Sequence, residues 1–168
     1  MTNTFQQPEE NFPVFELGYF DSLTGGPNRV RSRQGKIFLR LANGRPFHWI
    51  TLSIVSSIMP LKLKYKCMYK GNNSEDDRMA EAFEGAQCPQ ENASYIKKIA
   101  FESKIYYRCW LSRDRSRDEF ERDPAGAFWY PSGQFCGTDE DSRWITALEI
   151  KMPSLVGNWL EPLDRRDR

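Results

Sequence analysis

Aromatic rings, amides and charged side chains are most concentrated between residues 129 and 144. An aromatic ring covers the apolar face of a sugar, while amides, carboxylates and guanidinium groups bind its hydroxyls. Glycines at 133 and 137 let the backbone approach a ligand closely. This stretch therefore predicts a carbohydrate-binding site in which Trp129 or Tyr130 stacks on the sugar. The predicted ligand-binding residues are Trp129, Tyr130, Ser132, Gln134, Asp139, Asp141 and Arg143, with Gln87 and Asn92 from an equivalent earlier segment.

Two further rings belong to the same candidate set, and both open apolar segments. Trp144 follows Arg143 directly, and Tyr95 holds the corresponding place in the earlier segment. Rings beside alternating apolar residues also pack into cores. Core packing is therefore the favoured interpretation for Trp144 and for Trp49, with sugar binding as the alternative.

The sequence holds little that supports catalysis. His48 is the only histidine, so a two-histidine metal site or a zincin helix is excluded. The chain contains no glycine-rich phosphate-binding motif and no GxSxG segment. Acidic pairs at 76–77 and 139–141 match no EF-hand spacing and are predicted to be solvated turn residues. We therefore expect a protein that is not an enzyme and that has no metal and no cofactor.

Four cysteines occupy matching places in two segments of the chain. Cys67 and Cys88 correspond to Cys109 and Cys136, with a glycine shortly before the second cysteine of each pair. A disulfide within each segment is one interpretation, and two buried free thiols is the other. A reducing compartment keeps thiols free, so the absence of an export signal favours free thiols. No CxxC spacing is present, which argues against a zinc site.

The cysteine pairs belong to a wider internal repeat. HWITLSIV, SYIKKIAFE and SRWITALEIKM each begin near a ring followed by isoleucine, and each then alternates apolar and other residues. The repeat divides the chain into three units at residues 14–57, 61–103 and 104–152. Three units that cannot bury their apolar faces alone can close around one core. The predicted core positions on the last strands are Leu52, Ile54, Ile99, Phe101, Leu148 and Ile150.

Alternation with a period of two predicts an all-β fold with pseudo-three-fold repeats. A β-prism-like arrangement is preferred, with a β-trefoil as the alternative. One short helix is expected within residues 74–83, because SEDDRMAEAF begins with a cap-like serine and acidic residues. The predicted strands are 14–20, 36–41, 49–55, 62–67, 96–101, 105–111, 128–130 and 144–152.

Length and charge bound the remaining organisation. At 168 residues we expect one domain at 14–152, an N-terminal arm at 1–13 and a C-terminal tail at 153–168 that caps the core or docks on a partner. The insertion at 112–123 carries alternating charges and is expected to be a solvated loop. A net charge of +1 argues against nucleic acid as a partner. No apolar run predicts a membrane span, and no signal peptide is recognised, so we expect a soluble, cytoplasmic protein, with export by a non-standard route left open.

The third unit resembles a known family. Its order is the strand IYYRCWL, the rings Phe128 and Trp129, Gly133, the pair 137–138 and the alternating strand SRWITALEIKM. This is similar to the clostridial hydrophobic repeat with a conserved tryptophan, the ChW repeat, mainly over residues 104–152 and more weakly over 61–103. Two features depart from the pattern. Phe128 stands where the family has a glycine just before the tryptophan, and Tyr130 with Pro131 replaces the family's second strand, which contains a tryptophan. The resemblance implies a bacterial surface or secreted protein that adheres to or binds polymers.

Two hypotheses of function follow. The first is a non-enzymatic, lectin-like module that recognises a glycan through aromatic and polar loop residues. The second is a structural or protein-docking component of a larger assembly that uses its tails and loops to bind a protein partner.

Overall fold

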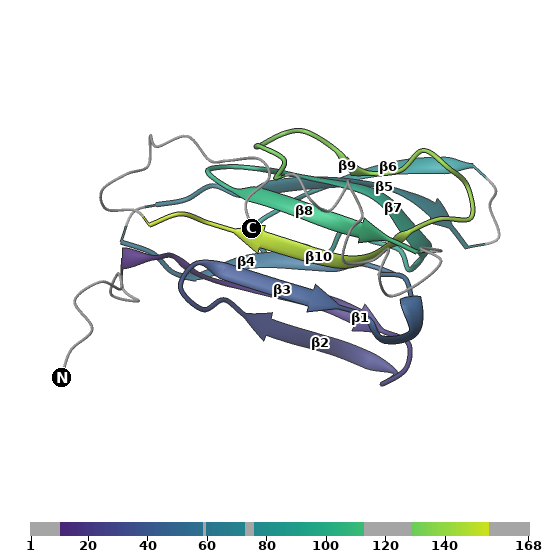
Figure 1. The fold of residues 1–168 in the computed structure, drawn as a ribbon, viewed down its shortest axis with the longest axis horizontal. Helices are drawn as coiled ribbons and strands as arrows, with labels where there is room; N and C mark the ends of the chain where they lie inside the picture. The colour runs from purple at the N-terminus through teal and green to yellow at the C-terminus, as the bar shows by residue number, and fades with distance from the viewer. Residues whose placement is uncertain (1–10, 59, 73–75, 113–128, 155–168) are drawn as a thin grey trace.

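The computed structural model describes residues 11–58, 60–72, 76–112 and 129–154, and in this part of the chain the fold is all-β. Ten strands form three antiparallel sheets (Figure 1). A short 3-10 helix covers Ala42–Gly44. The strands are β1 (Val14–Asp21), β2 (Gly26–Arg31), β3 (Lys36–Arg40), β4 (Ile50–Ser56), β5 (Lys64–Gly71), β6 (Asp77–Phe83), β7 (Ala93–Glu102), β8 (Tyr106–Leu111), β9 (Cys136–Gly137) and β10 (Ile145–Lys151).

Each sheet is built on an antiparallel pair made by the first and last strands of one sequence unit. The first sheet has the order β2-β1-β4, the second β3-β10-β8 and the third β6-β5-β7-β9. The pairs β1–β4, β5–β7 and β8–β10 therefore hold equivalent places in the three sheets. Their register repeats as well, through the opposed residues Leu17 and Leu52, Cys67 and Ile99, and Cys109 and Leu148.

Each sheet also receives a segment from another unit. β3 comes from the first unit but pairs with β10 in the second sheet, and β9 comes from the third unit but pairs with β7 in the third sheet. Cys88 of the second unit bridges Ile50 on β4, with backbone hydrogen bonds of 2.9 Å in both directions. The three units are thus linked in a closed ring, because each one contributes backbone hydrogen bonds to a neighbour's last strand.

The predicted core is confirmed at five of its six positions. Leu52, Ile99, Phe101, Leu148 and Ile150 are buried between the sheets, with 2% or less of each side chain exposed. The sixth, Ile54, is partly buried and packs against the same cluster. Alternate residues on equivalent strands share a face, which is why the sequence pattern located these positions.

The expected helix within residues 74–83 is wrong. Residues 77–83 form β6, which pairs along its full length with β5 and places Ala80 opposite Cys67. The helix propensity of the Met-Ala-Glu-Ala run is a weak preference, and the hydrogen bonds to β5 override it. β2 begins at Gly26 and includes Pro27. Pro27 is compatible with this strand, since β2 lies at the edge of its sheet.

Several predicted features fall outside the described residues. These are residues 1–10 of the arm at 1–13, residues 155–168 of the tail at 153–168, the insertion at 112–123 apart from Ser112, and Phe128. The predicted strand at 128–130 is represented only by a single bridge between Tyr130 and Tyr107. The assignment of the three sheets to a prism or a trefoil stays a prediction.

Candidate functional site

The fold divides the predicted carbohydrate site into two parts. The backbone N–H of Gly133 donates to the carbonyl of Phe101 at 2.8 Å, near the end of β7. The backbone N–H of Ser142 donates to the hydroxyl of Tyr95 at 3.2 Å, near the start of β7. Tyr95 and Phe101 are six positions apart on β7, which corresponds to roughly 20 Å along the strand. The segments 129–134 and 139–143 therefore do not enclose one ligand.

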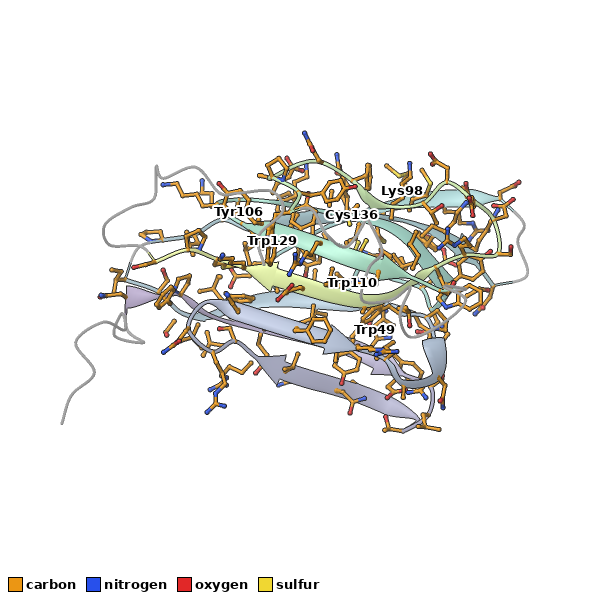
Figure 2. The ribbon with its side chains drawn as sticks, viewed as in Figure 1. Trp49, Lys98, Tyr106, Trp110, Trp129 and Cys136 are labelled. Atoms are coloured by element: carbon orange, nitrogen blue, oxygen red, sulfur yellow. The ribbon has the colours of Figure 1, made fainter. Side chains whose placement is uncertain are left out.

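Trp129 lies against β8 and is not available as a stacking surface (Figure 2). Its side chain is 1% exposed. The guanidinium carbon of Arg108 lies 4.4 Å from the centre of the ring, and the ammonium of Lys151 lies 5.4 Å from it. The prediction that a sugar stacks on Trp129 is therefore wrong. The residue is buried, and cationic side chains lie over its ring, so no face of the ring is open to a sugar.

The neighbouring predicted residues stabilise the loop that contains them. The ring of Tyr130 stacks on Tyr107 with centroids 6.4 Å apart. The hydroxyl of Ser132 accepts a hydrogen bond from the backbone of Ser103 at 3.1 Å, and the backbone carbonyl of Gln134 accepts one from the hydroxyl of Tyr107. These contacts hold the loop on the end of β7 and the start of β8.

Gln87 and Asn92, the two predicted ligand-binding residues from the second unit, differ in role. The side-chain amide of Gln87 donates to the carbonyls of Pro89 and Gln90, at 3.2 and 2.9 Å, so its N–H groups close a turn. Asn92 is exposed and immediately precedes β7. Asn92 therefore lies at the same end of β7 as Tyr95.

Gly137 serves the packing of β9 rather than the approach of a ligand. Its φ is 138°, and a Cβ at this position would lie 2.1 Å from the carbonyl oxygen of Lys97. Only glycine allows the two backbones to come this close. The sequence argument that Gly137 admits a ligand is corrected accordingly.

Asp141 belongs to a compact group of charges, here called the lysine–aspartate cluster and made of Lys70, Asp77, Lys97 and Asp141. The ammonium of Lys97 lies 3.1 Å from Asp77 and 3.0 Å from Asp141. The ammonium of Lys70 lies 3.0 and 3.1 Å from the same carboxylates. The cluster joins β5, β6 and β7 to the loop at 139–143, and Lys98 pairs with Asp139 beside it.

The electrostatics of the cluster favour its charged form. Burial acts against the charge of Asp77, but hydrogen bonds from Lys70 and Lys97 outweigh burial and lower the pKa of that carboxyl. A hydrogen bond from Lys97, assisted by one from Lys70, lowers the pKa of Asp141. The two carboxylates stay ionised and fixed on the lysines near neutral pH.

A β-bulge places Lys97 in this cluster. On β5, Tyr69 lies opposite Ile96, and Met68, the residue before it, lies opposite Lys98. Lys97 therefore has no residue opposite it on β5 and is the extra residue on β7. Its side chain is 0% exposed. The sequence missed the cluster, although its signal is present: two lysines between Ile96 and Ile99 break the alternation of a regular strand.

Two rings form a half-exposed surface next to the lysine–aspartate cluster, here called the ring platform and made of Tyr95 and Trp144. Their centroids lie 5.2 Å apart with the planes tilted by 46°. The indole N–H of Trp144 donates to the carbonyl of Gly44 at 2.7 Å. Both residues are partly exposed, so part of each remains accessible at the surface.

Polar groups border the ring platform. Ser142 is exposed, and its φ of 65° is held by the hydrogen bond from its N–H to Tyr95. Left-handed backbone at a residue other than glycine is strained, and such strain is common at binding sites. The guanidinium of Arg143 donates to the carbonyl of Ser112 at 3.1 Å and pairs with Glu140 at 3.5 Å. The loop at 139–143 thus carries a guanidinium, a hydroxyl and carboxylates, and it is attached at Ser142 to the ring of Tyr95 on β7.

The described residues show neither a group of three or more metal-binding side chains nor a helix long and apolar enough to cross a membrane. The four cysteines are buried and not joined in disulfides, and the sulfur atoms of Cys67 and Cys88 lie 3.4 Å apart. No protein-family model, characterised protein or solved structure shows significant similarity to this chain. The resemblance to ChW repeats stays a prediction.

Proposed function

We propose that this chain is a non-enzymatic, lectin-like module that binds a glycan at the ring platform. The observation that carries the proposal is the half-exposed pair Tyr95 and Trp144 beside the polar loop at 139–143. A sugar needs an aromatic face for its C–H groups and planar polar groups for its hydroxyls. Arg143 and Glu140 supply the polar groups, and Asn92 lies at the same end of β7.

Preorganisation supports this assignment. The lysine–aspartate cluster holds the loop at Asp141, and the hydroxyl of Tyr95 holds it at Ser142. A loop already fixed in position loses little conformational entropy when a ligand binds. The rigid part of the loop is also the part that carries Glu140 and Arg143.

A glycan array tests the proposal directly. Wild-type protein is expected to bind a defined set of glycans, and Trp144→Ala is expected to weaken that binding roughly tenfold, since ring stacking contributes about 1–2 kcal/mol. Tyr95→Phe keeps the ring but removes the hydroxyl that holds Ser142, so a smaller loss is expected. Thermal unfolding of each variant establishes that the fold is retained.

Phe83→Ala is the matched control for the ring substitutions. Phe83 is 70% exposed on β6, on a different surface, so its removal is expected to leave glycan binding unchanged. Equal loss in Trp144→Ala and Phe83→Ala would show that the binding is not specific to the platform. Failure of the wild type to bind any glycan would end the proposal.

One observation favours the protein-docking alternative. β6 is the last strand of its sheet, and it exposes 55% of Met79 and 70% of Phe83. An exposed edge strand offers unpaired backbone groups to another strand, and exposed apolar side chains add contact area. Sedimentation of the wild type and of Phe83→Lys tests this alternative. A complex that the wild type forms and Phe83→Lys does not form supports docking at β6, and identical sedimentation of the two proteins opposes it.

A further inference from the structure

The charges of this chain are unevenly distributed, although they nearly cancel. Between Asp21 and Glu75 the sequence contains ten lysines and arginines and no acidic residue. Six of these cations lie in the first unit, at positions 29, 31, 33, 36, 40 and 45. The surplus of positive charge therefore concentrates on the strands of that unit, where it creates a local field that the net charge of +1 conceals.

The fold displays four of these cations on β2, on β3 and on the turn between them, here called the basic hairpin: Arg29 and Arg31 on β2, Arg33 in the turn and Lys36 at the start of β3. The side chains of Arg29 and Arg31 are 77% and 60% exposed, and Arg33 and Lys36 are exposed as well. Arg33 and Lys36 exchange backbone hydrogen bonds of 3.0 and 3.1 Å. Figure 1 shows β2 and β3 side by side, on the opposite side of the molecule from β6 and β9.

Among the residues that the structure describes, little neutralises the basic hairpin. In the described part of the chain, the only carboxylate within 4 Å of the four cations is that of Glu16, which lies 3.8 Å from Arg29 and 3.4 Å from Arg31. Across the second sheet, Lys36 lies directly opposite Lys151. Like charges in opposed positions disfavour each other in a sheet, and the ammonium of Lys151 lies over the ring of Trp129, 5.4 Å from its centre.

We propose that the basic hairpin binds an acidic polysaccharide, a linear glycan that carries sulfate or carboxylate groups. Arg29 and Arg31 are two residues apart on β2, so their Cα atoms lie about 6.6 Å apart, and both side chains leave the same face of the strand beside Glu16. Guanidinium groups bind such oxyanions through two parallel hydrogen bonds. The proposal stands apart from the ring platform and does not depend on it.

The side chains favour a polysaccharide over a nucleic acid. Sites for single-stranded nucleic acid combine cations with exposed rings on which bases stack. The four positions of the basic hairpin carry only guanidinium and ammonium groups. The nearest exposed ring, Phe38 on β3, meets Trp110 edge to face with centroids 5.5 Å apart. Four cations beside a single exposed ring suit a polymer whose anions are borne on sugars better than one that is recognised by the stacking of successive bases.

Affinity measured against salt concentration tests the proposal, with heparin as the sulfated probe, polygalacturonate as the carboxylated probe and neutral dextran as the blank. Wild type is expected to bind at least one acidic probe and not dextran. Substitution of all four cations by glutamine is expected to weaken that binding at least tenfold. The slope of log affinity against log salt should also fall by about three, because fewer counterions are released.

A second quadruple variant separates the site from the net charge. Lys62, Lys64, Lys66 and Lys98, on and beside β5 and β7, are replaced by glutamine, which removes the same charge from another sheet. Retained binding in this control supports the basic hairpin, and equal loss in both variants overturns it. Tighter binding of single-stranded poly(U) than of either glycan at the same salt overturns the polysaccharide assignment. Trp144→Ala should leave this binding unchanged, so the ring platform and the basic hairpin fail or succeed separately.

Discussion

The ammonium of Lys97 lies 3.0 Å from a carboxylate oxygen of Asp141, although the lysine side chain is 0% exposed and the aspartate side chain is 72% exposed. A cation fixed in the sheet thus anchors an exposed loop. The hydrogen bond from Lys97 to the backbone carbonyl of Asp139, also 3.0 Å, adds a second attachment. The position of the loop at 139–143 therefore depends on a residue that belongs to the core of β7.

Replacement of Lys97 by methionine is expected to lower the free energy of unfolding by about 2–3 kcal/mol. This is less than the usual cost of breaking a fully buried pair, because water screens Asp141. Hydrogen exchange at Ser142 should accelerate, since the loop loses its anchor. Lys98→Met is the matched control: Lys98 is partly exposed, and its pair with the exposed Asp139 contributes less than about 1 kcal/mol. Equal effects of the two substitutions would contradict the anchoring role of Lys97.

The same cluster predicts a pH dependence of stability. The pKa values of Asp77 and Asp141 are lowered from 3.8 by the lysines, so their contribution is present above about pH 4 and is lost as the pH falls through the lowered values. The pKa values of Lys70 and Lys97 are raised from 10.5, so their contribution is complete below that pH and is lost as the pH rises further. Chemical denaturation between pH 2 and 6 checks the acid limb, which should be shallower in Asp141→Asn than in wild type.

Two tyrosines in equivalent positions make equivalent hydrogen bonds. Tyr65 donates to the carbonyl of Ala86, and Tyr107 donates to that of Gln134. Burial raises the pKa of Tyr65 to about 12, so the phenol stays protonated and can donate throughout the physiological range. Each Tyr→Phe substitution leaves a carbonyl without its partner and is expected to cost about 1–3 kcal/mol, measured by denaturant unfolding. Tyr106 is half-buried and adjacent to Tyr107, so Tyr106→Phe should cost less. An equal loss of stability in Tyr106→Phe would contradict the stabilising role of the Tyr65 and Tyr107 hydrogen bonds.

The sequence predicted the parts of this fold that local alternation determines. Leu52, Ile99 and Leu148 were located because alternate residues of a strand share a face. β9 was not predicted, since Cys136 and Gly137 become a strand only through their pairing with Ile99 and Lys98. A two-residue strand has no pattern of its own, and tertiary hydrogen bonds alone define it.

The candidate site was harder to predict than the core, for a related reason. Trp129 and Asp141 are only twelve residues apart in the sequence, but the chain between them runs along β7 and separates them. Nearness in sequence does not establish nearness in space for an extended segment. The ring platform instead joins Tyr95 and Trp144, which lie 49 positions apart and open equivalent strands. The internal repeat indicates this correspondence, because each ring directly precedes an isoleucine, Ile96 in one copy and Ile145 in the other.

Truncation of a core residue tests the strand equivalence. Leu148 is 1% exposed and lies opposite both Cys109 and Leu39. Leu148→Ala is expected to cost about 2–5 kcal/mol in unfolding free energy, as is usual for a buried leucine. Leu23→Ala is the control, because Leu23 is 68% exposed and its loss should cost less than about 0.5 kcal/mol. A small effect at Leu148 would show that the register of β10 is misassigned.

The thiols give the last prediction. A hydrogen bond to Cys88 together with burial raises the pKa of Cys67, and the same hydrogen bond lowers the pKa of Cys88. The thiolate is the reactive form, and both side chains are almost fully buried, so alkylation of the native protein should be slow and should reach Cys88 before Cys67. After denaturation all four cysteines should react, as counted by mass spectrometry. Peptides linked through Cys67 and Cys88, or through Cys109 and Cys136, would instead show that the protein matures in an oxidising compartment.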